Sequence, residues 1–191
     1  MPKVPPKIDE VCQSIQNIYR ELEIMQPVNV GQYHLAQVNT AKMRYSLDAP
    51  EMADFVAQIN SVNAVADDDP GFVWRLRGEG AEDATNIRVF DDESILITLT
   101  VWKSLEALSN YVYHGAHSDI MRSRRRWFEK VEQPILAMWW ICAGYTPTVN
   151  EAKKRLEHLQ QYGSTPYAFS FRKPFSPLDA LEYEQLNLAL T

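Results

Sequence analysis

Three side chains that could do chemistry end or begin predicted elements of secondary structure: Asn39, Trp102 and His117. An amide can hold a developing oxyanion, an indole offers a broad stacking surface with one N–H donor, and a neutral imidazole can move a proton. His117 follows Gly115 at the start of a predicted helix, where the helix dipole disfavours a positive charge. The three residues together predict a small-molecule site, and the alternative is that each is an ordinary packing or capping residue.

Other polar and aromatic residues fall on the same predicted faces. Side chains alternate along a strand, so Gln37 shares a face with Asn39, and Thr98 and Thr100 share a face with Trp102. A face with amides, hydroxyls and an indole favours a ligand over a dry core. The residues expected to bind substrate are Gln37, Thr98, Thr100, Tyr113, Arg124 and Trp140. For the arginine cluster at 122–126, the alternative is a solvated face paired with nearby glutamates.

The histidines of this region leave open which of them is functional. His114 ends the preceding predicted helix, where the dipole favours the protonated form, so it is the weaker candidate for a base. His114 and His117 could ligate a metal with Asp119, but no third histidine or further carboxylate completes such a site. We therefore expect no metal and no cofactor, with haem on His117 as the alternative.

Composition limits the class of protein. The chain has 191 residues, a formal net charge of −6 and 46% hydrophobic residues, which fits one domain with extensions. An acidic chain disfavours nucleic-acid binding, because phosphate requires a basic surface.

The longest strongly apolar run, residues 135–143, is too short to span a bilayer, and the polar N-terminus resembles no signal peptide. Two distant cysteines suggest no disulfide, so we expect a buried Cys142 thiol and a cytoplasmic location.

Hydrophobic periodicity predicts alternating strands and helices. Asp48 and Ser104 are expected to cap two of the helices. The predicted elements are an amphipathic helix at 7–25, a strand at 33–40, a helix beginning near Pro50 with an apolar stripe from Met52 to Val65, strands at 72–77, 87–90 and 95–102, helices at 104–114 and 117–131, a strand at 135–142, a helix within 146–163 and an extended segment at 167–175. The central order, β-α-β-β-α-β, is typical of the ferredoxin-like α+β fold.

The strand at 135–142 is apolar on both faces, which predicts that both faces of the sheet are covered. Helices account for one face, and the sheet of a second subunit would account for the other. We therefore expect a homodimer. On the strand at 72–77, Phe72, Trp74 and Leu76 are expected to share one face. Of Tyr111 and Tyr113, at most one is expected to face the site.

Several segments also resemble a known group of proteins. "PGFVWRL", "IRVFDD", "VWKSLEALSNYVY" and "PTVNEAKKRLEHL" are similar to an uncharacterised bacterial family within the dimeric α+β barrel superfamily, which includes antibiotic-biosynthesis monooxygenases. The resemblance covers about residues 33–175. It implies an N-terminal extension with a helix at 1–32, a barrel domain at 33–145, a family-specific helix and extended segment at 146–175, and a tail at 176–191.

The resemblance also implies a function. Members of the superfamily keep a pocket between their own sheet and helices, and many use no cofactor. The haem-degrading members place an Asn, a Trp and a His where this chain has Asn39, Trp102 and either His117 or His114. We expect an enzyme of specialised metabolism that acts on a hydrophobic or aromatic substrate, by cofactor-independent monooxygenation or by isomerisation or cyclisation through proton transfer. The alternatives are a haem-binding or haem-degrading protein, and a non-catalytic ligand-binding or assembly protein.

Overall fold

A four-stranded antiparallel sheet forms the centre of the computed structural model, which describes residues 32–113 and 122–188. The strands are β1 (Tyr33–Lys42), β2 (Phe72–Arg75), β3 (Ile95–Trp102) and β4 (Leu136–Cys142), and their order in the sheet is β2-β3-β1-β4. Long apolar β1 and β3 therefore pair at the centre, with Asn39 opposite Thr98 and Gln37 opposite Thr100. The ferredoxin-like α+β fold is confirmed. The helix predicted at 7–25 lies outside the described residues.

Within the described residues, four α-helices accompany the sheet: α2 (Ala53–Asp67), α3 (Leu105–Tyr113), α5 (Val149–Tyr162) and α6 (Pro177–Leu188). Ser104 caps α3 as predicted, since its Oγ accepts a hydrogen bond from the Ala107 N–H at 3.1 Å. Thr148 caps α5 by accepting from the Glu151 N–H at 3.2 Å. The Asp48 cap is wrong, because a 3₁₀ turn, η2 (Pro50–Met52), precedes α2 and its N-cap residue makes no side-chain cap bond.

Two predicted elements are corrected by the structure. Residues 87–90 are not a strand, and β2 ends at Arg75; Ile87, Val89 and Phe90 instead pack their side chains against the core. The helix predicted to reach residue 131 ends earlier, in a 3₁₀ turn, η3 (Arg124–Arg126), after which Phe128 forms an antiparallel bridge with Met43. Trp127 and Phe128 are drawn out of the helix because they join a buried cluster with Met43, Met52 and Leu96.

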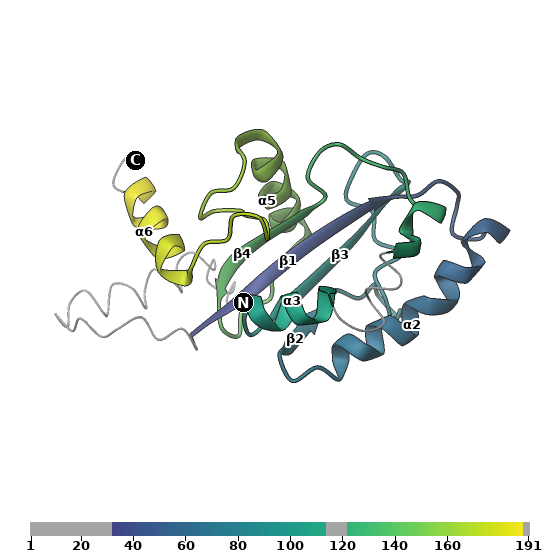
Figure 1. Ribbon diagram of the computed structural model, residues 1–191, viewed down its shortest axis with the longest axis horizontal. Coiled ribbons are helices and arrows are strands. Elements are labelled where there is room, and N and C mark those ends of the chain that lie inside the picture. Colours follow the sequence, from purple (N-terminus) through teal and green to yellow (C-terminus); the bar gives the residue numbers. More distant parts are fainter. Residues whose placement is uncertain (1–31, 114–121, 189–191) are drawn as a thin grey trace, which may run out of the picture.

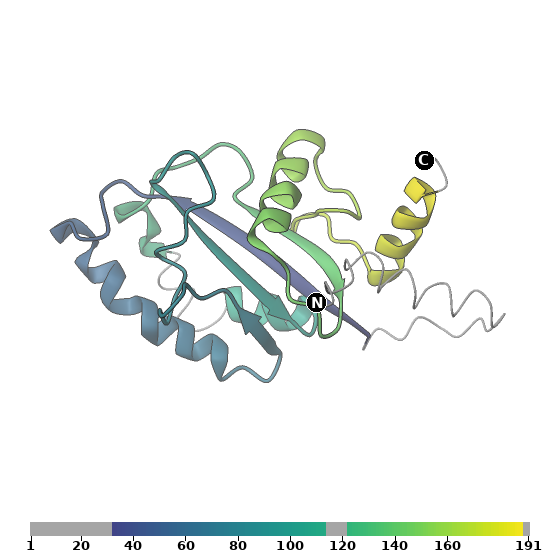
Figure 2. The ribbon, with the colours of Figure 1, turned by 180° about the vertical axis from the view of Figure 1, so that it is seen from behind.

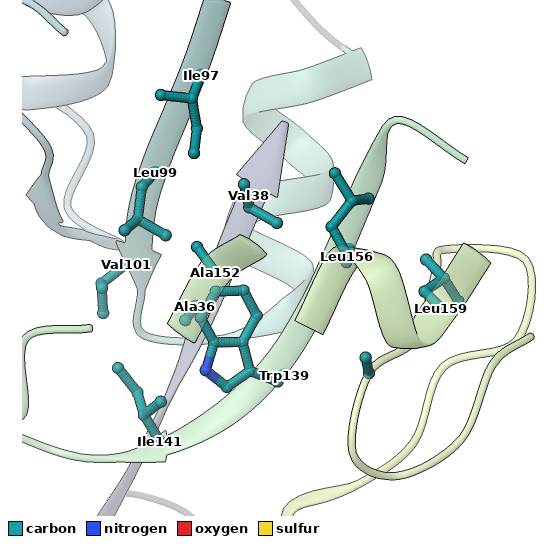
Figure 3. Packing of buried hydrophobic residues seen from close by; sticks show 12 residues of the cluster. Ala36, Val38, Ile97, Leu99, Val101, Trp139, Ile141, Ala152, Leu156 and Leu159 are labelled. Carbon is teal, nitrogen blue, oxygen red and sulfur yellow. The ribbon is translucent and has the colours of Figure 1, made fainter. Parts of the chain in front are cut away.

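The helices lie on opposite faces of the sheet. In Figure 1, α3 crosses in front of the strands, and Figure 2 shows α5 in front of them from behind. Ala152, Leu156 and Leu159 of α5 face the sheet side chains Val38, Leu99 and Trp139 (Figure 3). The opposite face carries Leu35, Met138 and Trp102, which pack with α3. α6 stands at one end, against β4 (Figure 1).

The chain itself covers the face that was assigned to a second subunit. Ala137, Trp139 and Ile141 of β4 are all buried within the single chain, because α5 and the segment that contains Ile87 and Val89 pack over them. The reasoning that a monomer would expose this row is therefore wrong. The apolar area of the row is already buried in one chain, so it cannot stabilise a dimer. The homodimer stays a prediction without that support.

Two further local predictions are corrected. Phe72 and Trp74 do not share a face, because a bulge between them shifts the register against β3. Phe72 consequently joins the cluster around Trp102, and Trp74 joins the cluster under α5. Cys142 is half-buried and disulfide-bonded, so the expectations of a buried free thiol and of no disulfide are wrong. Within residues 32–113 and 122–188, no helix has the length and hydropathy to cross a bilayer.

Candidate small-molecule site

A cavity of about 230 Å³ lies between the α2/α3 face of the sheet and the segments that cover it. Its floor is formed by β3, β1 and the start of β4, and its roof comes from α2, the end of α3, η3 and Phe128. Arg75, Leu76 and residues 83–85 also line it. The floor includes Gln37, Asn39, Ala41, Leu96, Thr98, Thr100 and Leu136, and the roof includes Phe55, Ile59, Val62, Asn63, Ala66, Tyr111, Val112 and Arg124. The roof is mainly apolar, whereas the floor carries a row of amides and hydroxyls.

The polar floor begins with a hydrogen-bonded chain of three side chains. The Trp102 Nε1–H donates to Thr100 Oγ1 at 2.9 Å, and the Thr100 hydroxyl donates to Gln37 Oε1 at 2.8 Å. Gln37 is only 7% exposed, and no partner of its Nε2 is found in the described part of the chain. The antiparallel pairing of β1 and β3 sets Gln37 and Thr100 opposite each other, where cross-strand side chains meet.

Asn39 and Thr98 continue this row on the neighbouring cross-strand pair. The Thr98 hydroxyl lies 3.5 Å from the Asn39 carbonyl oxygen, which is a weak contact with the backbone. Across residues 32–113 and 122–188, no hydrogen bond of the Asn39 side-chain amide is found, although the residue is half-buried against the cavity. A half-buried amide without a protein partner is available to a ligand.

Two arginines line the cavity, and they differ in whether a carboxylate pairs with them. Arg75 is neutralised, because its Nε and Nη2 bond both carboxylate oxygens of Asp67 at 2.9 and 3.0 Å, and this pairing lowers the Asp67 pKa. Arg124 is half-buried, and burial lowers the pKa of its guanidinium. No ion pair of the Arg124 guanidinium is found among the residues that the structure describes. A desolvated cation of this kind favours an anionic group beside it.

Tyr111 contributes a neutral phenol to the roof. Burial raises its pKa to about 12, so the hydroxyl stays protonated at neutral pH. Its oxygen lies 3.4 Å from the carbonyl oxygen of Val62, and its ring packs at 4.9 Å from that of Trp102. The Tyr111 hydroxyl donates its hydrogen bond to the Val62 carbonyl oxygen, and the residue contributes a neutral phenol that cannot act as a base in this state.

The structure brings together five of the predicted site residues. Gln37, Asn39, Thr98, Thr100 and Arg124 all line the cavity. Trp102 is not one of its walls: the ring is fully buried between Phe72 and Tyr111, and it reaches the cavity only through Thr100.

Two other predicted site residues, Tyr113 and Trp140, lie away from the cavity. Tyr113 is 58% exposed and packs edge-on against Phe171, away from the cavity. The Trp140 Nε1–H donates to the Phe175 carbonyl oxygen at 2.7 Å, and its ring joins the cluster near that residue. His114, His117 and Asp119 lie outside the described residues. Among the described residues, no cluster of three or more His, Cys, Asp or Glu side chains could hold a metal ion.

Sequence reasoning missed much of the roof. The sequence predicted an apolar stripe on this helix but no role for it in the site, whereas Phe55, Ile59 and Val62 face the cavity, and Val56 and Val65 are more than 40% exposed. An apolar stripe has the same pattern whether it meets packed side chains or an open space. Asn63, inside the same stripe, was the one available signal, because an amide among apolar residues suggests a polar neighbour.

An antiparallel β-α-β-β-α-β core with a partly polar cavity under its helices defines the class: a ferredoxin-like protein with a candidate small-molecule site. The chain belongs to a family described as a domain of unknown function, DUF3291, whose model matches residues 34–185.

Similar solved structures are distant. SnoaB, a cofactor-independent oxygenase from Streptomyces nogalater, is 15% identical with a TM-score of 0.39, covering 59% of this chain and 95% of that one. PA3566 from Pseudomonas aeruginosa is 10% identical with a TM-score of 0.39, covering 60% and 98%. NE2512 from Nitrosomonas europaea, of unknown function, is 8% identical with a TM-score of 0.40, covering 62% and 96%. No curated protein matches the chain.

Proposed function

We propose that the protein binds a compact hydrophobic or aromatic molecule in the cavity under α2 and α3 and acts on it as an enzyme. The observation that carries this proposal is the contrast inside the cavity: a mainly apolar roof faces a floor where the Gln37 and Asn39 amides have groups without a partner among the described residues. Small-molecule sites are typically apolar with a few polar groups that fix orientation.

The size of the cavity supports a small substrate. A dry apolar cavity of roughly 150 Å³ can hold benzene. The volume of about 230 Å³ therefore suits one ring or a compact pair of rings. A tetrapyrrole is larger than this, which makes haem the weaker alternative. A haem titration tests it, because a Soret band that disappears in His117→Ala would favour haem binding over the proposal.

The described residues suit reactions that build negative charge on oxygen. The Asn39 amide can donate to an enolate or phenolate oxygen, and Arg124 supplies positive charge in a partly desolvated setting. Both cofactor-independent monooxygenation and isomerisation or cyclisation pass through such an anion. Each needs a base to remove the first proton, and His117, with His114 as its alternative, is the candidate that the sequence predicts for that role.

Mass spectrometry of the purified protein under native conditions tests the proposal by identifying a retained small molecule. Asn39→Ala and Arg124→Met should lose that molecule while the melting temperature stays near that of the parent protein. With the molecule in hand, turnover is measured in His117→Ala and His114→Ala. Loss of a general base lowers turnover by roughly 10²–10⁴-fold. Retention of the molecule in both cavity variants would contradict the site, and unchanged turnover in both histidine variants would contradict their role as the base.

A further inference from the structure

The hydrogen-bonded chain Trp102–Thr100–Gln37 determines which end of the Gln37 amide meets the cavity. An indole N–H can only donate, so Thr100 Oγ1 is the acceptor of the 2.9 Å bond from Trp102. The Thr100 proton is then free to go to Gln37 Oε1, 2.8 Å away. This leaves the Gln37 Nε2 group, with its two protons, as the end without a partner among the described residues.

The reverse orientation of the amide is less favourable by one hydrogen bond. If Nε2 faced Thr100, the hydroxyl oxygen would receive two N–H donors, and its own proton would lose the acceptor that Gln37 Oε1 provides. Thr100 is half-buried and lines the cavity, so only a water inside the cavity could replace the missing acceptor, and a ligand that fills the cavity excludes that water. The indole therefore acts on the amide from outside the cavity.

We infer that Trp102 and Thr100 are positioning residues that hold Gln37 as a hydrogen-bond donor, so that the cavity selects molecules presenting an acceptor oxygen to Nε2. The inference rests on the proposed function and narrows its substrate class to compact rings bearing a carbonyl, carboxylate or enolate oxygen. Asp83 and Arg124 both line this cavity; the Asp83 carboxylate accepts hydrogen bonds from the Thr85 N–H and hydroxyl, and Arg124 adds a preference for a negatively charged oxygen. Trp102 does not stack on the substrate.

Three fluorinated probes of similar size allow a direct test by ¹⁹F NMR. 4-Fluoroacetophenone carries an acceptor oxygen, 4-fluoroaniline carries an N–H donor, and 4-fluorotoluene carries neither. The quantity measured is the preference of the full-length protein, defined as the Kd of 4-fluoroaniline divided by the Kd of 4-fluoroacetophenone. 4-Fluorotoluene reports the apolar contribution, so that a change in apolar binding can be separated from a change in the preference.

Trp102→Phe and Thr100→Val should both reduce this preference. Phenylalanine removes the indole donor, so Thr100 can accept from Gln37 Nε2 and the amide can turn. Valine removes the hydroxyl that discriminates between the two ends of the amide. One neutral hydrogen bond corresponds to a fall of roughly two- to tenfold. Thr100→Ser keeps the hydroxyl and should restore the preference of the parent protein.

Thr40→Val is the matched control. Thr40 is buried, whereas Thr100 is half-buried, and it lies on the opposite face of the sheet, where its hydroxyl contacts the Ile135 carbonyl oxygen. This variant makes the same chemical change and should leave the preference unaltered. A second control, Ala41→Phe, fills the floor of the cavity and should weaken the binding of all three probes. Melting temperatures establish that each variant is folded, and Trp102→Phe alone decides the question if Thr100→Val does not fold.

The two possible failures are distinguishable. An unchanged preference in folded Trp102→Phe, with probe binding still blocked by Ala41→Phe, would overturn the positioning role and leave the cavity as a binding site. Probe binding that is unaffected by Ala41→Phe would place the probes elsewhere and contradict the proposed function itself. A reduced preference in Trp102→Phe and Thr100→Val, restored in Thr100→Ser and kept in Thr40→Val, would establish the inference.

Discussion

The sheet face under α5 and the face under α2 and α3 treat their polar groups differently. Under α5, the Trp139 Nε1–H donates to Glu151 at 2.8 Å, the Tyr145 hydroxyl donates to the same carboxylate at 2.7 Å, and Arg155 lies 3.5 Å from it. Arg155 also stacks 3.8 Å from the ring of Tyr167. Under α2 and α3, amides and a guanidinium end in a cavity. On the first face most of these polar groups bond to one another, although the buried Arg155 Nε has no hydrogen-bond partner among the described residues. On the second face the polar groups line a cavity that could take a ligand.

The largest expected effect is on stability, on the α5 face. Trp139→Ala removes a fully buried indole together with its bond to Glu151, and such truncations cost about 3–5 kcal/mol of the free energy of unfolding. Urea denaturation measures this loss. Trp139→Phe keeps most of the ring and should cost much less. Nearly equal losses in the two variants would assign the effect to the hydrogen bond to Glu151 rather than to packing.

Arg124→Met tests the cavity face, where the effect should fall on binding. Hydrogen bonds to charged groups are worth roughly 1.5–3 kcal/mol, so a carboxylate probe such as 4-fluorobenzoate should bind about ten- to a hundredfold more weakly. The free energy of unfolding should change little, because the guanidinium is half-buried and makes no ion pair within the described residues. Arg125, an exposed neighbour, supplies the control Arg125→Met. Equal weakening in both variants would point to general charge attraction instead of a specific contact.

Asn39→Leu should separate function from stability most clearly. The amide has no hydrogen-bond partner in the described part of the chain, so an apolar side chain should leave the free energy of unfolding within about 0.5 kcal/mol or raise it. Ligand binding in the cavity should be lost, which calorimetry or ¹⁹F NMR can measure. A loss of stability above about 2 kcal/mol would indicate that Asn39 belongs to a closed core, as its counterparts under α5 do.

The smallest expected effect is a dependence of stability on pH from the α5 face. Burial, followed by the charge of Arg155, lowers the pKa of His158, whose Nε2 lies 2.9 Å from Thr165 Oγ1. A folded pKa below the unfolded value of about 6.5 means that this contribution is present above that pH and is lost as the pH falls below it. Denaturation at pH 7.5 and 5.5 should show a smaller loss in His158→Gln than in the parent protein.

His34 must be included in that measurement. Burial and the charge of Lys103 lower its pKa as well, so it contributes a loss in the same direction. His34→Gln and the double variant apportion the effect between the two sites. If the pH dependence of His158→Gln equals that of the parent protein, then His158 is not buried in solution as the structure describes it.

The sequence alone determined the faces of the central strands. Side chains alternate along a strand, so Gln37 and Asn39 had to share one face, and so did Thr98, Thr100 and Trp102. The helix caps at Ser104 and Thr148 are equally local, because a cap depends on a few adjacent residues. Gln37, Asn39, Thr98 and Thr100 could thus be brought to one cavity from pattern and topology, whereas the pattern of the arginine cluster did not determine that Arg124 lines it.

Only the tertiary structure decided what covers each face and what each residue meets there. A strand that is apolar on both sides gives the same pattern whether α5 or another chain packs on it. The bulge between Phe72 and Trp74 adds one residue to one strand and is invisible to a period of two. Trp102 lies on the same face of the sheet as the site, but its ring does not reach the cavity. Phe72 and Tyr111, which belong to other elements, enclose the ring. Alternation is a property of neighbouring residues, whereas enclosure depends on segments that meet only when the chain folds.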